Sequence, residues 1–244
     1  KVFFIIFKKN FLIWLKDYII EDSYKTLKIL NQKIKFFVPN STTFWRVNTF
    51  FSKEPETLKW IDNFGNSNKF IFWDIGSNIG LYSIYNSIKN PDSVSIAFEP
   101  STSNLRILSR NISLNNLEKR IKIFTNPLTN RENKFLLMNE ESFTEGGAMN
   151  TFGENFNFEG KNFISKMKYQ ILGTNINYLV KNNILEIPDY IKIDVDGIEH
   201  LILDGGDMYL KDPKIKTILI EINENFKDQH SSIIKIMEEK NFKF

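Results

Sequence analysis

Five short apolar runs alternate with helix-like segments from residue 70 onward. The runs that predict strands are Phe70–Asp74, Ser93–Phe98, Ile121–Thr125, Tyr190–Val195 and Thr217–Ile222. The segments that predict helices are Leu81–Ile88, Leu105–Asn111, Ile198–Leu203 and Ser231–Lys240. Nearly continuous apolar strands that alternate with helices indicate a parallel sheet covered on both faces. With right-handed crossovers, this pattern predicts a doubly wound, mostly parallel, Rossmann-like α/β sheet over residues 70–244.

Two parts of the chain depart from this alternation. Residues 1–69 are expected to form an N-terminal extension, with Tyr18–Leu30 helical, Lys33–Val38 extended and Glu54–Phe64 helical. The stretch at about 134–170 is rich in Gly, Asn and Phe and interrupts the strand and helix order. We expect an inserted hairpin or lid there, either mobile over the acceptor site or rigid against the sheet edge.

The first residues mix apolar and basic positions. Val2–Phe7 and Phe11–Leu15 are apolar, but lysines interrupt them. No run therefore reaches the roughly 18 to 20 apolar residues that span a bilayer. No small-residue cleavage site follows, which argues against a secretory signal. We expect a cytoplasmic protein whose first helix lies in the core or at a homodimer contact; an interfacial membrane helix is the less favoured alternative.

Composition removes several kinds of site. The 244 residues include no Cys and two His, which excludes disulfide scaffolds, thiolate zinc sites, cysteine nucleophiles and histidine-rich metal sites. Hydrophobic residues make up 42% and charged residues 25%, as is usual for a chain with a sizeable core. The formal net charge of +3 is too small to indicate a nucleic-acid partner by itself.

Four acidic residues lie at or near predicted strand ends: Asp74, Glu99, Asp194 and Glu221. In a doubly wound sheet the ligand binds beyond the carboxyl ends of the strands, at the point where the strand order reverses. We therefore expect these carboxylates to face a shared crevice rather than the core.

The sharpest local signal is the segment Asp74–Gly80. Gly76 allows a tight turn and a close approach of the backbone to a ligand, and Gly80 allows close packing at the helix start. The dinucleotide fingerprint and the lysine of a phosphate-binding loop are both absent. An Asp before the glycines suits a cationic ligand, and Glu99 is placed to accept ribose hydroxyls, which favours S-adenosylmethionine over NAD. The alternative is an ordinary turn in which Asp74 caps the helix.

Several motifs together resemble the FkbM-family S-adenosylmethionine-dependent methyltransferases. They are Lys53–Leu58, Asp74–Ile84, Phe98–Pro100 and Ile191–Glu199. The resemblance covers about residues 50–225 and is more specific than any one motif. It implies a class I methyltransferase fold and, usually, O-methylation of a hydroxyl on a small molecule or glycan, such as a secondary metabolite or surface polysaccharide. This sequence departs from the family at Ser77 (commonly Ala), Asp196 (commonly Glu) and Asn177 (commonly Asp).

The resemblance also implies a set of cofactor-binding residues. These are Asp74, Gly76, Ser77, Asn78, Gly80, Glu99, Pro100 and Asn126. Asn126 is our hypothesis for the adenine contact; as an alternative it forms the turn before Pro127.

Methyl transfer to a hydroxyl requires alignment and a group that accepts the proton. Asp194 is the first candidate because it ends the strand nearest the family's reaction centre, and Glu221 and His200 are alternates. A hard divalent ion could also be bound through the oxygens of four carboxylates: Asp194, Asp196, Glu199 and Glu221. Acidic helix starts explain Asp196 and Glu199 without a metal, so no metal site is predicted.

Two other classes of function stay open, namely a nucleic-acid methyltransferase and a non-catalytic cofactor-binding module. Amino-methylating enzymes of nucleic acids carry [DNS]-P-P-[YFW] after the fourth strand, where this chain has Asp194–Gly197. No stripe of basic and aromatic residues stands out after residue 70. We therefore expect a small-molecule or glycan acceptor and no nucleic-acid partner.

Overall fold

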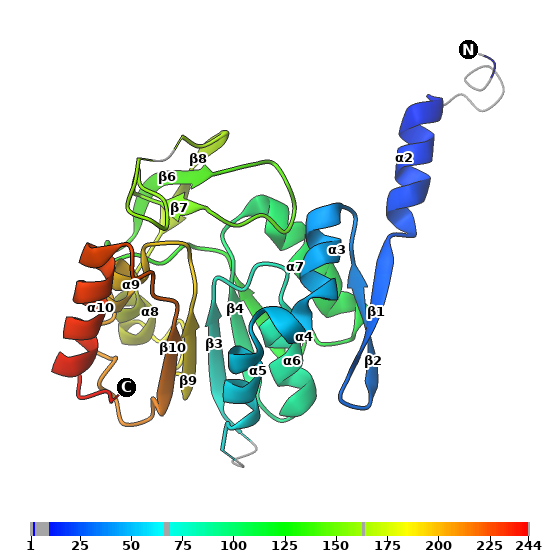
Figure 1. Cartoon of the computed structure of the whole chain (residues 1–244). Coiled ribbons are helices and arrows are strands. Elements are labelled where there is room, and N and C mark those ends of the chain that lie inside the picture. The colour runs from blue at the N-terminus through cyan, green and yellow to red at the C-terminus, as the bar shows by residue number, and fades with distance from the viewer. Residues whose placement is uncertain (1, 3–9, 66–68, 163, 244) are drawn as a thin grey trace.

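A computed structural model describes residue 2 and residues 10–65, 69–162 and 164–243. Most of the apolar segment Val2–Phe7 lies outside these described residues. A five-stranded parallel sheet forms the centre of the molecule, in the order β10-β9-β3-β4-β5 (Figure 1). Its strands are β3 (Ile71–Ile75), β4 (Val94–Phe98), β5 (Ile121–Phe124), β9 (Tyr190–Ile193) and β10 (Thr217–Ile220). The predicted parallel α/β sheet is confirmed, and its order reverses between β3 and β9.

Alternate side chains of the strands pack into two separate hydrophobic cores. Phe72 and Tyr190 pack into one cluster with α5 (Pro55–Asp62), α6 (Leu81–Lys89) and α7 (Thr102–Leu114). Trp73 and Ile191 pack into the other cluster with α8 (Ile176–Lys181), α9 (Glu199–Asp204) and α10 (Lys227–Glu239). Burial on both faces explains why the strands are apolar at nearly every position.

The N-terminal part contains a helix, a hairpin and three further helices. Its elements are α2 (Phe11–Glu21), β1 (Tyr24–Ile29), β2 (Gln32–Phe37), α3 (Ser41–Asn48), α4 (Phe50–Lys53) and α5. The predicted helix over Tyr18–Leu30 is wrong beyond Glu21, because β1 pairs with β2 in an antiparallel register over six positions. Lysines alternate with buried apolar residues over Lys33–Phe36 of β2, which is the period of a strand with one buried face. The extended segment Lys33–Val38 and the helix within Glu54–Phe64 are confirmed.

The hairpin is fastened to α7 by two asparagine side chains. Asn111 accepts a hydrogen bond from the Phe37 N–H over 2.8 Å. Asn115 accepts from the Lys35 N–H and donates to the Lys35 carbonyl, each over 2.9 Å. These bonds satisfy the open edge of β2. Buried residues of the hairpin and of α5 belong to the same core cluster as β3, so the core is continuous across residues 69 and 70.

The predicted insert contains a small antiparallel sheet in the order β7-β6-β8. Its strands are β6 (Lys134–Glu140), β7 (Thr151–Phe152) and β8 (Met167–Gly173). Figure 1 shows it as a separate layer above the central sheet. In the described part of the chain, none of the helices has the length and apolarity needed to span a membrane.

Candidate active site

A cavity of about 380 Å³ lies where β3, β4 and β9 end. Its floor is formed by the strand tips at the reversal of strand order, where doubly wound sheets bind their ligands. The insert contributes Met138, Gly147, Ala148, Met149, Asn150 and Phe152. The N-terminal part contributes Trp45, Arg46, Phe50, Lys53 and Glu54. The cavity is therefore shaped jointly by the central sheet, the insert and the N-terminal helices.

Most of the residues that the sequence singles out line this cavity. They are Gly76, Ser77, Asn78, Glu99, Pro100, Asn126, Asp194 and Glu221. Two of the predicted cofactor residues, Asp74 and Gly80, lie beneath the turn and do not line it.

Asp74 joins β3 to the start of α6. Its side chain is fully buried, and Oδ2 accepts hydrogen bonds from the Ser83 N–H over 3.0 Å and from Ser83 Oγ over 2.6 Å. Ser83 is the third residue of α6, so Asp74 satisfies one of the free N–H groups at that helix start. This arrangement matches the helix-capping alternative rather than a direct ligand contact. Gly80 allows the close packing expected at the same helix start, because a Cβ there would lie 2.5 Å from Leu108.

Gly76 lets two strand tips touch. It adopts φ +84°, and a Cβ at this position would lie 1.8 Å from the carbonyl oxygen of Asp194. No other residue type fits this contact without moving the backbone. The close approach that the sequence predicts for a ligand is thus made by the end of β9.

Ser77 and Asn78 present polar atoms to the cavity. Ser77 Oγ and Asn78 Oδ1 are buried, and neither has a hydrogen-bond partner among the described residues. Buried polar atoms are nearly always paired in folded proteins, so unpaired ones beside a cavity indicate where a ligand would bond. Asn78 adopts φ +51°, which turns its backbone N–H toward Glu99.

Glu99 follows β4 and is 5% exposed. Its carboxylate accepts hydrogen bonds from the N–H groups of Asn78 and Ser101, each over 2.8 Å. Burial raises the pKa of Glu99 to about 8, against the opposing effect of these two donors. Donors from a ligand would favour the ionised form further. Asn126 also lines the cavity and donates to the Leu172 carbonyl over 2.8 Å, so both interpretations of this residue stay open.

Lys192 is a site residue to which the sequence analysis gave no role. It faces Asp74 in the register of β3 and β9, and its Nζ donates to Asp194 Oδ2 over 2.5 Å. The Lys192 side chain is buried, which would lower its pKa, but the charges of Asp194 and Asp74 raise the pKa instead. A lysine inside an otherwise apolar strand was the signal available in the sequence.

The charge of Lys192 sets the state of Asp194. Burial alone would raise the pKa of Asp194, but the Lys192 ammonium reverses this effect and lowers it to about 2. Removal of water by the cavity wall and the negative charge of Asp194 both raise the pKa of Glu221. The residue is nevertheless exposed at the mouth of the cavity. The two carboxylates lie close enough for each to shift the pKa of the other. They therefore differ in proton affinity although they are neighbours.

The other acidic residues near β9 have separate tasks. Glu199 is buried and accepts from the N–H groups of Val195 and Gly197, and it does not line the cavity. His200, the third candidate base, also lies outside the cavity lining. Over the described ranges no group of three or more His, Asp or Glu side chains could hold a metal ion.

The N-terminal helices supply one wall with mixed charges. Glu54 accepts from the Tyr82 hydroxyl over 2.7 Å and from Lys53 Nζ over 2.5 Å. Arg46 donates to the carbonyl of Gly146 in the insert. Lys53 and Glu54 belong to a motif that the sequence analysis noted, but their place at the cavity depends on how α4 packs and was not predicted.

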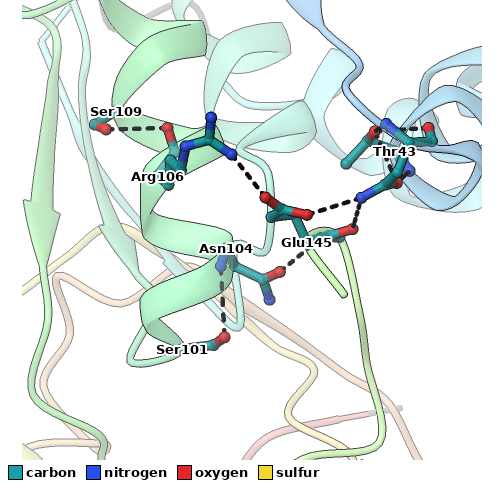
Figure 2. A network of polar contacts seen from close by, with 8 residues as sticks. Thr43, Ser101, Asn104, Arg106, Ser109 and Glu145 are labelled. Atoms are coloured by element: carbon teal, nitrogen blue, oxygen red, sulfur yellow. Dashed lines mark hydrogen bonds and ion pairs between the residues drawn. The ribbon is translucent and has the colours of Figure 1, made fainter. Parts of the chain in front are cut away.

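The loop before β7 is fastened over the cavity by side chains from two helices (Figure 2). Glu145 pairs with Arg106 of α7 over 2.7 Å and accepts from the Asn40 amide over 3.1 Å. Asn104 of α7 accepts from the Gly146 N–H over 2.8 Å and donates to the Gly147 carbonyl over 3.2 Å.

The same loop also touches both strand tips. The Gly147 carbonyl accepts from the Asn78 amide over 2.7 Å. Asp196 accepts from the N–H groups of Met149 and Asn150, over 2.8 and 3.4 Å. Burial and the charge of Asp194 raise the pKa of Asp196 to about 6, against these two donors. The loop therefore covers the cavity in this structure and is not confined to the sheet edge.

A family model described as "Methyltransferase FkbM domain" matches residues 74–244. This chain belongs to the FkbM methyltransferase domain family. The match confirms the resemblance seen in the sequence.

Individual relatives are more distant. The methyltransferase sdnD of Sordaria araneosa is 45% identical over 56 residues, which is 23% of this chain and 21% of that protein. The S-adenosylmethionine-dependent methyltransferase from Agrobacterium tumefaciens has a TM-score of 0.52 at 13% identity, covering 88% of this chain and 58% of that one. The FkbM methyltransferase from Methylobacillus flagellatus KT has a TM-score of 0.49 at 16% identity, covering 81% and 47%. The chain thus spans less than two thirds of each of these relatives, and the Agrobacterium structure confirms the class I methyltransferase fold.

Proposed function

We propose that this protein transfers a methyl group from S-adenosylmethionine to a hydroxyl of a small molecule or glycan. The observation that carries the proposal is the single cavity shared by two groups of side chains. Ser77, Asn78 and Glu99 offer hydrogen-bonding atoms on one side, and Asp194 and Glu221 offer carboxylates beside them. A cofactor and an acceptor bound there would be neighbours.

The cofactor side fits a nucleoside. The unpaired Ser77 Oγ and Asn78 Oδ1 would bond polar groups of the cofactor, and Glu99 would accept from the ribose hydroxyls. Asn126 would contact the adenine from the end of β5. When bound, S-adenosylmethionine supplies an already activated methyl group on its sulfonium. The protein must therefore align the acceptor and accept a proton.

On the acceptor side of the cavity, the carboxylate of Asp194 is in its ionised form. Lys192 keeps Asp194 ionised, so Asp194 can accept the hydrogen bond of a hydroxyl and hold its oxygen in place. A hydroxyl oxygen that gains a methyl group becomes a strong acid, so even a weak base can take its proton. Asp194 receives this proton, and Glu221, whose pKa the charge of Asp194 raises, lies beside it as the second candidate base.

The walls of the acceptor side suit a compact hydroxylated molecule. Trp45, Phe50 and Tyr82 give apolar surface, while Lys53 and Glu54 give a donor and an acceptor beside it. Hydroxyl groups both donate and accept hydrogen bonds, so they match neighbouring charges of opposite sign.

The experiment is an assay of S-adenosylhomocysteine release against a panel of free sugars, glycan fragments and polyketide alcohols. Mass spectrometry of the product locates the new methyl group. We expect a methyl ether from at least one acceptor, and an Asp194→Asn variant that still binds cofactor but is about 10²–10⁴-fold slower. Methylation at nitrogen or carbon, or full turnover by the variant, would overturn the proposal.

A further inference from the structure

The helix α2 carries apolar side chains on most of its circumference, interrupted by Lys16, Asp17 and Glu21, and none of its residues is buried. Consecutive apolar residues occupy Phe11–Leu15, and because successive residues point in different directions they cover most of the circumference. Leu12 is 72% exposed and Ile13 60%, and Tyr18 and Ile19 are each 57% exposed. Figure 1 shows this helix extending away from the body of the molecule. Ile20, in the last turn of α2, packs against the core cluster, so the expectation that α2 packs in the core is met only at this end of the helix.

Exposed apolar side chains on several faces of a helix are stabilised when an apolar medium covers those faces. A second copy of the chain would cover one side of α2 and leave the other sides in water. A lipid bilayer surface has no such limit, because side chains on several faces can enter it. Trp14 and Tyr18 stack with their ring centroids 5.7 Å apart, and both residue types favour the boundary between lipid headgroups and acyl chains.

The charges in this part of the sequence are ordered along the chain. Between Lys1 and Lys16 the charged residues are Lys1, Lys8, Lys9 and Lys16, with no acidic residue among them. Acidic residues follow at Asp17, Glu21 and Asp22. Anionic lipid attracts a basic segment that adjoins an apolar helix and repels an acidic one. This order points the beginning of α2 toward the lipid and its end toward the body of the protein.

The helix is joined firmly to the body. Ser23 lies two residues after its last residue, Glu21, and the Ser23 hydroxyl donates to the Ile19 carbonyl over 2.6 Å. The Ser23 carbonyl accepts from the Val38 N–H over 2.8 Å, which ties the end of α2 to the β1–β2 hairpin. Because Asn111 and Asn115 hold this hairpin on α7, a bound α2 would orient the whole molecule.

We propose that α2 binds the surface of an anionic lipid bilayer, with its apolar side chains in the headgroup region and Lys16 among the lipid phosphates. This inference is independent of the catalytic proposal, since none of the residues of α2 lines the cavity.

The test is sedimentation of the full chain with phosphatidylcholine vesicles that contain or lack phosphatidylglycerol. The variant is Ile13→Asn combined with Ile19→Asn, and the matched control is Ile184→Asn combined with Met208→Asn, two exposed apolar residues elsewhere. We expect wild type and control to bind the anionic vesicles, and the α2 variant to lose at least about tenfold in affinity. Lys16→Gln should lose about fivefold on anionic vesicles only.

The outcomes of this test distinguish lipid binding by α2 from contact between two copies of the chain. Failure of the wild type to bind anionic vesicles, or equal binding by the α2 variant, would overturn the proposal. Light scattering on the same proteins detects the alternative. A wild-type dimer that the α2 variant converts to a monomer, with no vesicle binding, would assign the helix to contact between copies of the chain.

Discussion

Lys192 Nζ donates a hydrogen bond to Asp194 Oδ2 over 2.5 Å, between alternate residues at the end of β9. The lysine is buried next to Asp74 on β3, and both members of the pair line the cavity. The sequence hypothesis treated Asp194 as an isolated base. In the structure it is one half of an ion pair whose other half is buried in the sheet.

This pair predicts the effect of removing the lysine. Without the ammonium, burial would raise the pKa of Asp194 from about 2, so that it becomes protonated as pH falls toward neutrality. We expect Lys192→Met to lower turnover about 10²-fold and to move the acidic limb of the pH–rate profile upward. The measurement is turnover against pH with an acceptor found in the release assay.

Lys216→Met is the matched control, because Lys216 also pairs with an aspartate of the sheet region but is 43% exposed at the opposite end. Its profile should match that of the wild type. An unchanged acidic limb in Lys192→Met would show that the ion pair does not set the state of Asp194.

Gly76 is predicted to be a folding residue as well as a turn residue. A Cβ at φ +84° costs roughly 1–2 kcal/mol, and contact with the Asp194 carbonyl adds to that. We expect Gly76→Ala to lower the free energy of unfolding by at least about 2 kcal/mol. Urea denaturation measures this, with Gly65→Ala as the control, because a Cβ at Gly65 has only an ordinary contact at 3.6 Å. Equal free energies of unfolding for the two variants would contradict the observed contact.

Cofactor affinity should depend on pH through Glu99. Its pKa is raised to about 8 in the protein alone, while ribose hydroxyls bond best to the ionised form. Binding at lower pH must therefore release a proton. We expect affinity for S-adenosylhomocysteine to rise, by up to about tenfold per unit, as pH approaches 8 and to level off above it. Calorimetry in buffers of different ionisation enthalpy counts the proton, and Glu99→Gln should abolish both effects. Affinity that falls as pH rises would refute this role.

The loop over the cavity should loosen when Asn104 is truncated. This side chain bonds both Gly146 and Gly147, so Asn104→Ala removes two hydrogen bonds at the centre of the loop. The bonds from Arg46 and Asn78 to these glycines remain, and Glu145 and Asp196 still hold the flanks. We expect faster hydrogen exchange at residues 145–150. Ser109→Ala on the same helix is the control, because its hydroxyl bonds only the carbonyl of Arg106 (Figure 2).

Wild type with cofactor and acceptor completes the lid experiment. Slower exchange in the loop on binding is the result expected of a lid. Strong and equal protection with and without ligands would identify a rigid cover instead.

The sequence predicted those parts of the fold that depend on local pattern. The apolar runs Phe70–Asp74, Ser93–Phe98 and Tyr190–Val195 predicted the parallel sheet because each strand is buried on both faces. The Tyr18–Leu30 prediction failed because the β1–β2 hairpin and its packing on α7 outweigh helical periodicity.

Within the site, it was easier to predict which residues take part than to predict which side chains they contact. The strand-tip acids were recognised, but the burial of Asp74 under the turn depends on the packing of α6. The roles of Lys192, Arg46 and Glu54 follow from side-chain contacts between strands and helices far apart in the sequence. Such contacts have no periodic signature in a single sequence.

We propose that the cavity at the tips of β3, β4 and β9 binds S-adenosylmethionine. Calorimetry with S-adenosylhomocysteine tests this binding most directly. Wild type is compared with Glu99→Ala and with Glu118→Ala, which removes an exposed carboxylate after α7. The account predicts saturable binding by wild type and by Glu118→Ala, and an affinity about 10- to 100-fold lower for Glu99→Ala, the loss expected for hydrogen bonds to a charged group. No binding by the folded wild type, or equal affinity in all three proteins, would contradict the account.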